Sequence, residues 1–357
     1  MRRSFDVLVA GGGPAGSTAA IALCRSGFSV ALVEEDDYKS FRLGETLPPM
    51  IRPQLTALGV WERFLAGKPL ESYGIESESA WETPIPRRQD FIRNPYGCGW
   101  HVDRARFDGM LAAAAAEAGA ELLVSARVVS CRRGSDHQWL LDCTRNGTRL
   151  TLGGRMLVDA TGRRALLAGR LGAQPQAADR LLGAVALSDH LETEQWTLIE
   201  AIEEGWWYSA PLPGGRTVFT CMTDADLWKE AKWQDLLKSA PLTFQRAGGI
   251  ELPPPLEIVS AATLIRRPVT GLGWLAVGDA ALAFDPLSGQ GVLKSIDTAS
   301  RAASVAAHYL DGDAAGLAEY ESWIEETYQA YLATRSQFYR GVERWPASRF
   351  WKRRGVS

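Results

Sequence analysis

Three glycines near the start of the chain, Gly11, Gly13 and Gly16, have the spacing of a phosphate-binding turn. They follow an apolar run, residues 7–10, and open a segment of small residues with helical spacing. The first glycine permits a tight turn, the second lets the backbone approach a pyrophosphate, and the third lets helix and strand pack closely. The phosphates would lie on the helix N-terminus. The next apolar run ends in Glu34, a carboxylate placed to hold a ribose hydroxyl, so the sequence predicts a dinucleotide site.

Two later segments repeat this order of strand and polar turn. One is Asp159 to Gly162, directly after a buried strand, and the other runs from Gly278 to Val292. Asp279 ends its strand where a carboxylate could accept a hydrogen bond from a polyol such as the ribityl chain of FAD. The turn 286–291 would present backbone N–H groups at a helix start, which stabilises negative charge such as that of a reduced flavin. Together the three segments narrow the predicted dinucleotide to FAD.

Composition and charge exclude several classes of function. The 357 residues have a formal net charge of −3, which gives no electrostatic basis for nucleic-acid binding, and no window is apolar and long enough to cross a bilayer. The five cysteines have no C-x-x-C spacing and the four histidines are scattered, which argues against a disulfide framework or a metal site. Met1 is followed almost at once by the first predicted strand, leaving no room for a signal peptide. We therefore expect a cytoplasmic protein with no metal, no nucleic-acid partner and no membrane span.

A largely parallel sheet must position these turns. The predicted fold class is α/β, with a Rossmann-like FAD-binding domain, an antiparallel-sheet substrate domain that interrupts it, and C-terminal helices. The predicted boundaries are 1–72, 101–180 and 265–310 for the FAD-binding domain, 73–100 and 181–264 for the substrate domain, and 311–357 for the C-terminal helical segment. The tail from Trp345 carries four basic residues, and we expect it to be a solvated, locally basic end.

The combined motifs resemble FAD enzymes of the aromatic-hydroxylase superfamily, which includes flavin monooxygenases, flavin-dependent halogenases and geranylgeranyl-reductase-like proteins. The resemblance rests on the glycine turn with Glu34, the loop 44–48, Arg104, the segment 159–162, and Gly278-Asp279 followed by 285–291. It covers nearly the whole chain. It implies that Arg104 touches the FAD phosphate or ribose region, Asp279 the ribityl chain, and Gly289 and Gly291 the flavin ring. The full set of predicted cofactor contacts is Gly11, Gly13, Pro14, Ala15, Gly16, Glu34, Glu35, Arg42, Arg104, Val128, Asp159, Gly162, Gly278, Asp279, Pro286, Gly289, Gly291 and Val292.

The details separate the chain from the halogenases that it otherwise resembles. Halogenases carry W-x-W-x-I-P, whereas the similar stretch here, 206–211, has Tyr208 for the second tryptophan and Ala210 for isoleucine. They also need a lysine after the glycine-glutamate loop, and no lysine lies between Lys68 and Trp81. Halogenation is therefore the less favoured reading. As a whole, the chain most resembles the short flavoproteins that mature tryptophylquinone-dependent amino-acid oxidases by oxygenating a tryptophan of their partner protein.

This resemblance implies a monooxygenase that hydroxylates an aromatic group through a flavin C4a-hydroperoxide. A tryptophan within a protein or peptide is one candidate substrate, O₂ is the oxidant, and NAD(P)H or a reductase is the electron donor. Two alternatives stay open: a flavin-dependent reductase of prenyl or other alkene groups, and a flavin-bearing maturation or binding partner of another protein.

Candidate substrate and catalytic residues follow from the two interruptions that would cover the flavin. A reactive oxygenated flavin must be kept dry, and large aromatic side chains can do this. The predicted substrate pocket is lined by Trp81, Trp100, Trp206, Trp207 and Tyr208. Glu45 and His101 are the candidates for proton transfer, with structural roles in the proline loop and at a strand end as the alternative for each.

Overall fold

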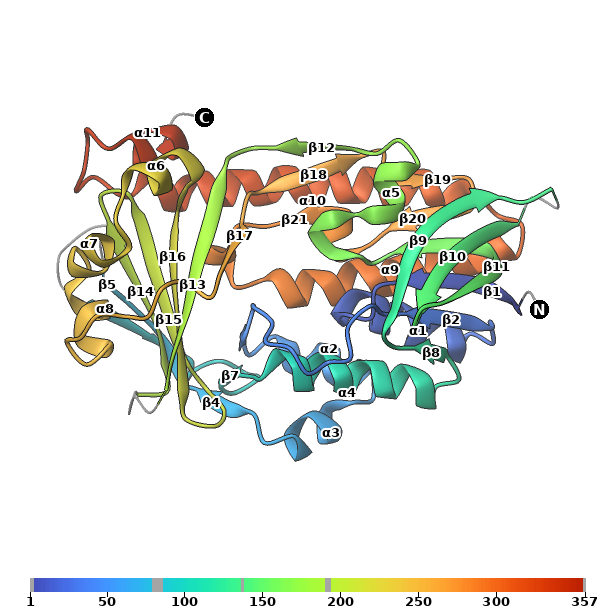
Figure 1. Ribbon diagram of the computed structural model, residues 1–357, viewed down its shortest axis with the longest axis horizontal. Coiled ribbons are helices and arrows are strands. Elements are labelled where there is room, and N and C mark those ends of the chain that lie inside the picture. The colour runs from blue at the N-terminus through green and yellow to red at the C-terminus, as the bar shows by residue number, and fades with distance from the viewer. Residues whose placement is uncertain (1–2, 79–85, 136–137, 190–193, 356–357) are drawn as a thin grey trace.

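The computed structural model describes residues 3–78, 86–135, 138–189 and 194–355, and it shows two large sheets joined by long helices (Figure 1). The first, the dinucleotide sheet, is parallel at its centre, where β1 pairs with β2 on one side and β11 on the other. In spatial order its strands are β19 (Thr270–Gly271), β20 (Trp274–Ala276), β11 (Thr148–Asp159), β1 (Arg3–Ala10), β2 (Val30–Val33) and β8 (Glu121–Leu123). An antiparallel hairpin of β9 (Ala126–Arg133) and β10 (Trp139–Arg145) extends from β11. Val7 to Ala10 of the central strand β1 are fully buried.

The second sheet, the antiparallel sheet, combines the two segments that interrupt the dinucleotide pattern. Its order is β17 (Glu257–Ser260), β13 (Leu181–Asp189), β16 (Arg216–Asp224), β15 (Gly205–Leu212), β14 (Trp196–Ile202), β5 (Gly74–Glu78) and β6 (Pro86–Asp90). All neighbours are antiparallel except β14 and β5, which join the two interruptions in parallel. The predicted fold class is thus confirmed, while the exact domain boundaries stay a prediction.

The larger helices link the two sheets. Helix α1 (Pro14–Arg25) packs against α4 (Arg104–Glu117) and α9 (Gly291–Leu310) beneath the dinucleotide sheet. The longest helix, α10 (Ala315–Arg340), runs from the dinucleotide sheet to the antiparallel sheet, where α11 (Arg349–Gly355) ends the described chain (Figure 1). The shorter helices are α2 (Ile51–Ala57), α3 (Trp61–Ala66), α5 (Leu166–Arg170), α6 (Ala225–Glu230), α7 (Trp233–Lys238) and α8 (Pro241–Arg246). None of the helices in the described ranges is both long and apolar enough to span a bilayer.

Two small sheets and three 3-10 turns complete the fold where the dinucleotide sheet meets the antiparallel sheet. One small sheet has the order β3 (Thr46–Leu47), β7 (Gly99–His101) and β4 (Leu70–Ser72), and the other β12 (Gln174–Ala177), β18 (Leu264–Arg267) and β21 (Leu282–Ala283). The 3-10 turns are η1 (Gly162–Arg164), η2 (Gly278–Ala280) and η3 (Pro286–Ser288). The predicted segment 159–162 runs into η1, and the predicted segment 278–292 contains η2 and η3.

The basic tail is only partly solvated: Arg349, Lys352 and Arg353 are exposed as expected, but Arg354 and the aromatic residues near it are packed into the protein. Phe350 and Trp351 are buried, and the Arg354 guanidinium lies 3.8 Å from the centre of the Phe350 ring. Arg354 donates to the buried Asp224 carboxylate at 2.6 Å, which compensates its charge. Phe350, Trp351 and Arg354 are the buried residues of α11, and burial of the two aromatic rings, with Arg354 paired to Asp224, outweighs the local charge.

Candidate cofactor and substrate site

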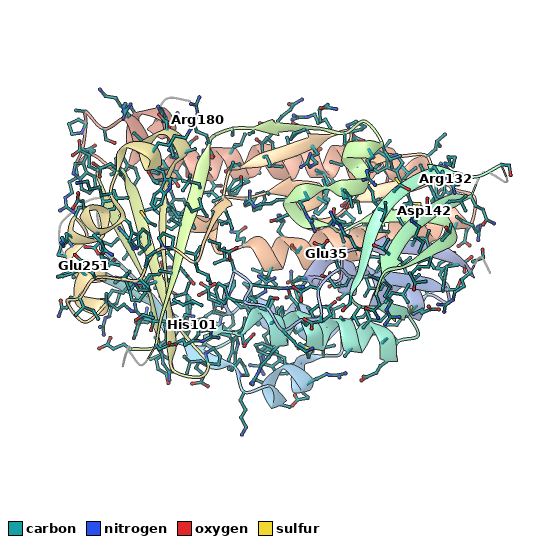
Figure 2. All side chains as sticks on the ribbon, viewed as in Figure 1. Glu35, His101, Arg132, Asp142, Arg180 and Glu251 are labelled. Carbon is teal, nitrogen blue, oxygen red and sulfur yellow. The ribbon has the colours of Figure 1, made fainter. Side chains whose placement is uncertain are left out.

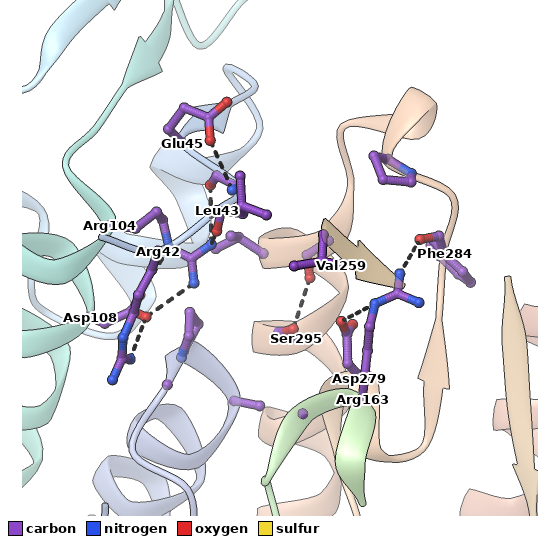
Figure 3. A pocket seen from close by; sticks show the side chains of 18 of the residues that line it. Arg42, Leu43, Glu45, Arg104, Asp108, Arg163, Val259, Asp279, Phe284 and Ser295 are labelled. Carbon is purple, nitrogen blue, oxygen red and sulfur yellow. Dashed lines mark hydrogen bonds and ion pairs between the residues drawn. The ribbon is translucent and has the colours of Figure 1, made fainter. Parts of the chain in front are cut away.

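A cavity of about 980 Å³ lies between the two sheets, with walls from both (Figure 3). This volume is at the upper end of the range of roughly 300–1,000 Å³ that is usual for ligand sites. Most predicted cofactor contacts lie on its wall: Gly11, Gly13, Pro14, Ala15, Glu34, Glu35, Arg42, Arg104, Val128, Gly162, Asp279, Pro286, Gly289, Gly291 and Val292. The walls therefore run from the first glycine turn to the start of α9.

The first glycine turn is shaped by backbone contacts that exclude side chains. Gly11 has a φ of +99°, and a Cβ there would lie 2.2 Å from the carbonyl oxygen of Ala160. A Cβ on Gly16 would lie 1.8 Å from the oxygen of Gly11. Gly16 is off the cavity wall, so its part is the close packing of α1 rather than contact with a cofactor. Gly13 has open space where a Cβ would be and caps α1, which leaves the helix N-terminus accessible to a phosphate.

The predicted ribose end is a network of charges around Glu34. One Glu34 carboxylate oxygen accepts from the Gly12 amide at 2.5 Å, and the other accepts from Arg42 at 3.1 Å. Arg42 also donates to Asp108 at 3.0 Å. Burial alone would lower the pKa of Arg42, but the charges of Asp108, Glu34 and Asp36 raise it above its usual value. The guanidinium is therefore a permanent cation on this wall.

Arg104 supports the loop beside it. Its guanidinium donates to the Leu43 carbonyl at 2.6 Å and to both Asp108 oxygens at 3.1 Å (Figure 3). Gly44, with a φ of +90°, leaves the space that the guanidinium needs. The buried Asp108, which the sequence reading missed, thus joins the two arginines. Its spacing of four residues from Arg104 on one helix was a usable signal.

A second charged group lies where the ribityl chain was predicted. Lys294 on α9 donates to Asp279 at 2.5 Å. The Arg163 guanidinium lies 3.5 Å from the other Asp279 oxygen (Figure 3). Burial alone would raise the pKa of Asp279, but the charges of Lys294 and Arg163 hold it below its usual value. Asp279 is therefore ionised and can accept hydrogen bonds from a polyol. Sequence reasoning missed Lys294 and Arg163, because their partner is 15 residues from one and 116 from the other along the chain.

The turn before α9 presents bare backbone to the cavity. Gly289 has a φ of +60°, and a Cβ on Gly289 or Gly291 would meet nothing within 4 Å. Gly291 is the first residue of α9, so the free N–H groups at the start of that helix face the same space. Bare glycine backbone at both ends of the cavity, with an ionised carboxylate between them, fits the phosphates, polyol and electron-rich ring of FAD.

Asp159 has another role than the predicted contact with the cofactor. It is buried and off the cavity wall, and its oxygens accept from the Thr161 hydroxyl at 2.6 Å and from the amides of Leu167 and Ala168 at 2.9 and 2.7 Å. These are the unpaired amides at the start of α5, so Asp159 stabilises that helix start. Gly278 is likewise off the wall; its φ of +58° and its packing against Ala15 shape the turn before Asp279.

The far end of the cavity is formed by the antiparallel sheet. Apolar wall residues there are Ile75, Phe91, Ile199, Met222 and Val259, and the polar ones include Glu45, Thr46, Ser72, Thr197 and Tyr208. The Tyr208 and Thr46 hydroxyls are 2.5 Å apart. Burial first, and then the Glu45 charge and hydrogen bond, raise the pKa of Tyr208 well above its usual value, so its hydroxyl stays protonated.

His101 lies behind this wall, between the antiparallel sheet and the dinucleotide half (Figure 2). Its Nδ1 is 3.1 Å from the Thr46 hydroxyl, and its Nε2 has no hydrogen-bond partner among the described residues. Burial, helped by the Arg246 charge, lowers the pKa of His101 to about 3. The ring is therefore neutral near pH 7, and it contacts Thr46 rather than the cavity.

Three of the predicted pocket tryptophans belong to the core. Trp206 is fully buried and donates to the Tyr339 hydroxyl at 3.2 Å, and Trp207 is fully buried and donates to the Leu236 carbonyl at 3.0 Å. Trp100 packs edge-on against Phe64 at 5.5 Å. None of the three is on the cavity wall, so this prediction was wrong for them, whereas Tyr208 does line the cavity. Trp81 lies outside the described residues.

The strand geometry of β15 explains this outcome. Successive side chains on a strand point to opposite faces, so Trp207 faces α7 while Tyr208 faces the cavity. Trp206 shares the face of Tyr208 but lies farther along the strand, under α10 and α11. An aromatic run in the sequence cannot show which of its members a neighbouring helix covers.

Comparisons with known proteins agree with this site. The chain matches the protein family described as "FAD binding domain" over residues 4–334. It is 30% identical over 362 residues to LodB of Marinomonas mediterranea, which is named as an FAD-dependent oxidoreductase, covering 98% of this chain and 97% of LodB.

Solved structures share the fold. The flavin-dependent halogenase CmlS has a TM-score of 0.88 at 23% identity, covering 100% of this chain and 68% of CmlS. QhpG, described as a peptidyl tryptophan dihydroxylase essential for tryptophylquinone cofactor biogenesis, has a TM-score of 0.78 at 22% identity, covering 99% of this chain and 79% of QhpG. The chain therefore belongs to the FAD-binding-domain family and is an FAD-dependent oxidoreductase.

Proposed function

We propose that this flavoprotein is a monooxygenase that hydroxylates an aromatic ring, and that the ring is the side chain of a tryptophan within a peptide or protein. The observation that carries the proposal is the far end of the cavity. It combines an apolar wall with the carboxylate of Glu45 and the hydroxyl of Tyr208, and no lysine lies among the described residues that line it. A buried acceptor in an apolar chamber suits an aromatic substrate that must lose a proton.

The chemistry can be divided between cofactor and protein. Reduced FAD supplies the activation of O₂ for oxygen transfer. Overall, one O₂, two electrons and two protons from NAD(P)H or a reductase convert a ring C–H into C–OH and release water. Ile75, Ile199 and Met222 exclude bulk water from the chamber, which suppresses unproductive loss of activated oxygen.

We propose that Glu45 accepts the proton that the ring carbon loses. Its carboxylate faces the cavity, and its position is held by the Gly44 amide, which donates at 2.9 Å. Tyr208 stays protonated, so it donates a hydrogen bond rather than acting as a base. Thr46 and His101 hold that hydroxyl in place from behind.

The relatives support this choice of substrate without deciding it. QhpG is a peptidyl tryptophan dihydroxylase by its description, and this chain has the same fold over nearly its full length. CmlS, which is a halogenase, is more similar in fold, with a TM-score of 0.88 against 0.78 for QhpG. The absence of a lysine from the described cavity wall favours hydroxylation, because the resemblance to halogenases implies that such a lysine carries the hypohalous acid.

The test is a product analysis with labelled oxygen. The purified protein, loaded with FAD, is incubated with NADH or NADPH, a flavin reductase, ¹⁸O₂ and peptides that contain a single tryptophan, in the presence of chloride and bromide. We expect mass spectrometry to show one ¹⁸O atom for each hydroxyl added to the indole, and none without reductant.

Three results would contradict the proposal. A halogenated indole would identify a halogenase, and anaerobic reoxidation of the reduced flavin by an alkene would identify a reductase. Normal maturation of a bound partner by Asp279→Ala protein that has lost FAD would identify a binding partner without catalysis.

A further inference from the structure

We propose that the C-terminal helix α10 is part of the flavin site. Tyr331, Arg335 and Tyr339 act as positioning residues, which hold the turn before α9 through its first residue, Asp285. This inference concerns the binding of FAD and does not depend on the reaction that the enzyme catalyses.

Both carboxylate oxygens and the backbone N–H of Asp285 make hydrogen bonds. One carboxylate oxygen accepts from the Tyr339 hydroxyl at 2.6 Å and from the Arg335 guanidinium at 3.3 Å. The other accepts from the Leu287 amide at 3.0 Å, inside the turn. The backbone N–H of Asp285 donates to the Tyr331 hydroxyl at 2.8 Å. Three of these four bonds come from α10, and the Asp285 side chain is 1% exposed.

The three α10 residues form one stripe. They are spaced by four residues, so they lie above one another on the same face of the helix. Arg335 also donates to Asp179 at 2.7 Å, where the chain enters the antiparallel sheet. The Tyr331 ring stacks on Phe284, with ring centres 3.8 Å apart and planes 8° apart. The stripe therefore anchors both the turn and the residue that precedes it.

This anchor bears on the ring end of the cavity. The turn is internally bonded, because the Ser288 hydroxyl donates to the Asp285 carbonyl at 3.0 Å and the Gly289 amide donates to the Pro286 carbonyl at 3.0 Å. A turn closed in this way moves as a unit with Asp285, and Pro286 to Gly289 line the cavity. The glycine turn at the opposite end is held by Glu34 and Tyr38 instead. Substitutions that break the bonds from α10 to Asp285 should therefore weaken contacts to the flavin ring. The contacts to the adenosine end of FAD should stay unchanged.

The experiment compares FAD with ADP, which lacks the flavin half. Apoprotein is prepared by removing FAD from the full chain, and the dissociation constants of both ligands are measured by calorimetry. For Tyr339→Phe we expect about a tenfold weaker affinity for FAD, the size of the lost hydrogen bond to the charged Asp285. The substitution also removes the acceptor of the Trp206 indole N–H, which lies off the cavity wall, so that loss should lower stability rather than ligand affinity. The affinity for ADP should stay within about twofold, and the midpoint potential of bound FAD should fall, because misplaced N–H groups stabilise the reduced anion less.

Further variants separate positioning from general stability. Arg335→Met should weaken FAD binding more than Tyr339→Phe, and Arg335→Lys should recover part of the loss because it keeps the charge. Glu325→Gln on the same helix removes the pair with Arg267 at 2.7 Å, away from the turn, and should change neither affinity. Equal loss of FAD and ADP binding in Tyr339→Phe, or unchanged binding of both, would overturn the proposal. If Arg335→Met does not fold, the Tyr339→Phe comparison still decides.

Discussion

Glu45 is the residue on which the proposed proton transfer depends. A positioned acid or base typically contributes about 10²–10⁴-fold to a rate. We expect Glu45→Gln to lower the turnover of tryptophan peptides by a factor in that range while FAD stays bound. Stopped-flow measurement of flavin reduction is the internal control, since that step does not need the carboxylate. Full activity in Glu45→Gln would return Glu45 to a structural role in its proline loop.

We expect His101 to affect the pH dependence of the protein's stability rather than its catalytic rate. Burial lowers its pKa in the folded protein to about 3, from its usual value of 6.5. The unfolded chain therefore binds the extra proton between these values, and stability rises with pH through this window. It is fully present above pH 6.5 and is lost as the pH falls toward 3.

The magnitude can be checked by urea denaturation at two pH values. Linkage predicts that the wild-type protein is about 2 kcal/mol less stable at pH 5 than at pH 7 on account of His101 alone. In His101→Gln this difference should shrink by about that amount, while the other titrating groups keep their effect. An unchanged pH dependence in the variant would mean that the folded protein accommodates a charged ring at this position.

Asp159 is a single side chain on which the start of a helix depends. Its carboxylate caps α5 from the end of β11, so its removal leaves buried amides unpaired. We expect Asp159→Ala to cost about 2 kcal/mol or more of unfolding free energy, yet to change the affinity of the folded protein for FAD by less than about twofold.

A matched control for Asp159→Ala is available on another helix. Asp313 accepts from the Ala315 amide at 2.9 Å at the exposed start of α10, and Asp313→Ala should cost only about 1 kcal/mol. Chemical denaturation and FAD titration of both variants give the comparison. A large loss of FAD affinity in Asp159→Ala, with stability preserved, would restore the predicted cofactor contact.

The cavity exists only because the two sheets are held together: α10 runs from one sheet to the other, and α11 packs on the antiparallel sheet (Figure 1). Trp351 on α11 is buried and donates to the Ile202 carbonyl of β14 at 2.9 Å. Truncation of a buried tryptophan typically costs about 3–5 kcal/mol. We expect Trp351→Ala to lose stability in this range by urea denaturation, whereas Lys352→Ala, with an exposed side chain, should change it by less than about 0.5 kcal/mol. Equal small effects would mean that the tail is dispensable.

The cofactor and the fold class follow from residues that are close together in the chain. The first glycine turn is a local device, because Gly11 and Gly16 are required by backbone contacts that any chain with this strand, turn and helix would make. The two later segments, Asp159 to Gly162 and Gly278 to Val292, are equally local. Local geometry can be inferred from neighbouring residues, so the sequence predicts FAD.

Which side chains reach the cavity depends on packing between segments that are far apart in the chain. Trp207 and Tyr208 are neighbours in the chain, but the pleat of β15 sends one into the core and the other to the cavity. Asp285 is held by residues 46 to 54 positions later, on a helix whose pattern alone gave no sign of this contact. Direction on a strand and pairing across long stretches of chain are set by packing, which is why the glycines revealed the cofactor and the structure was needed to identify the walls around it.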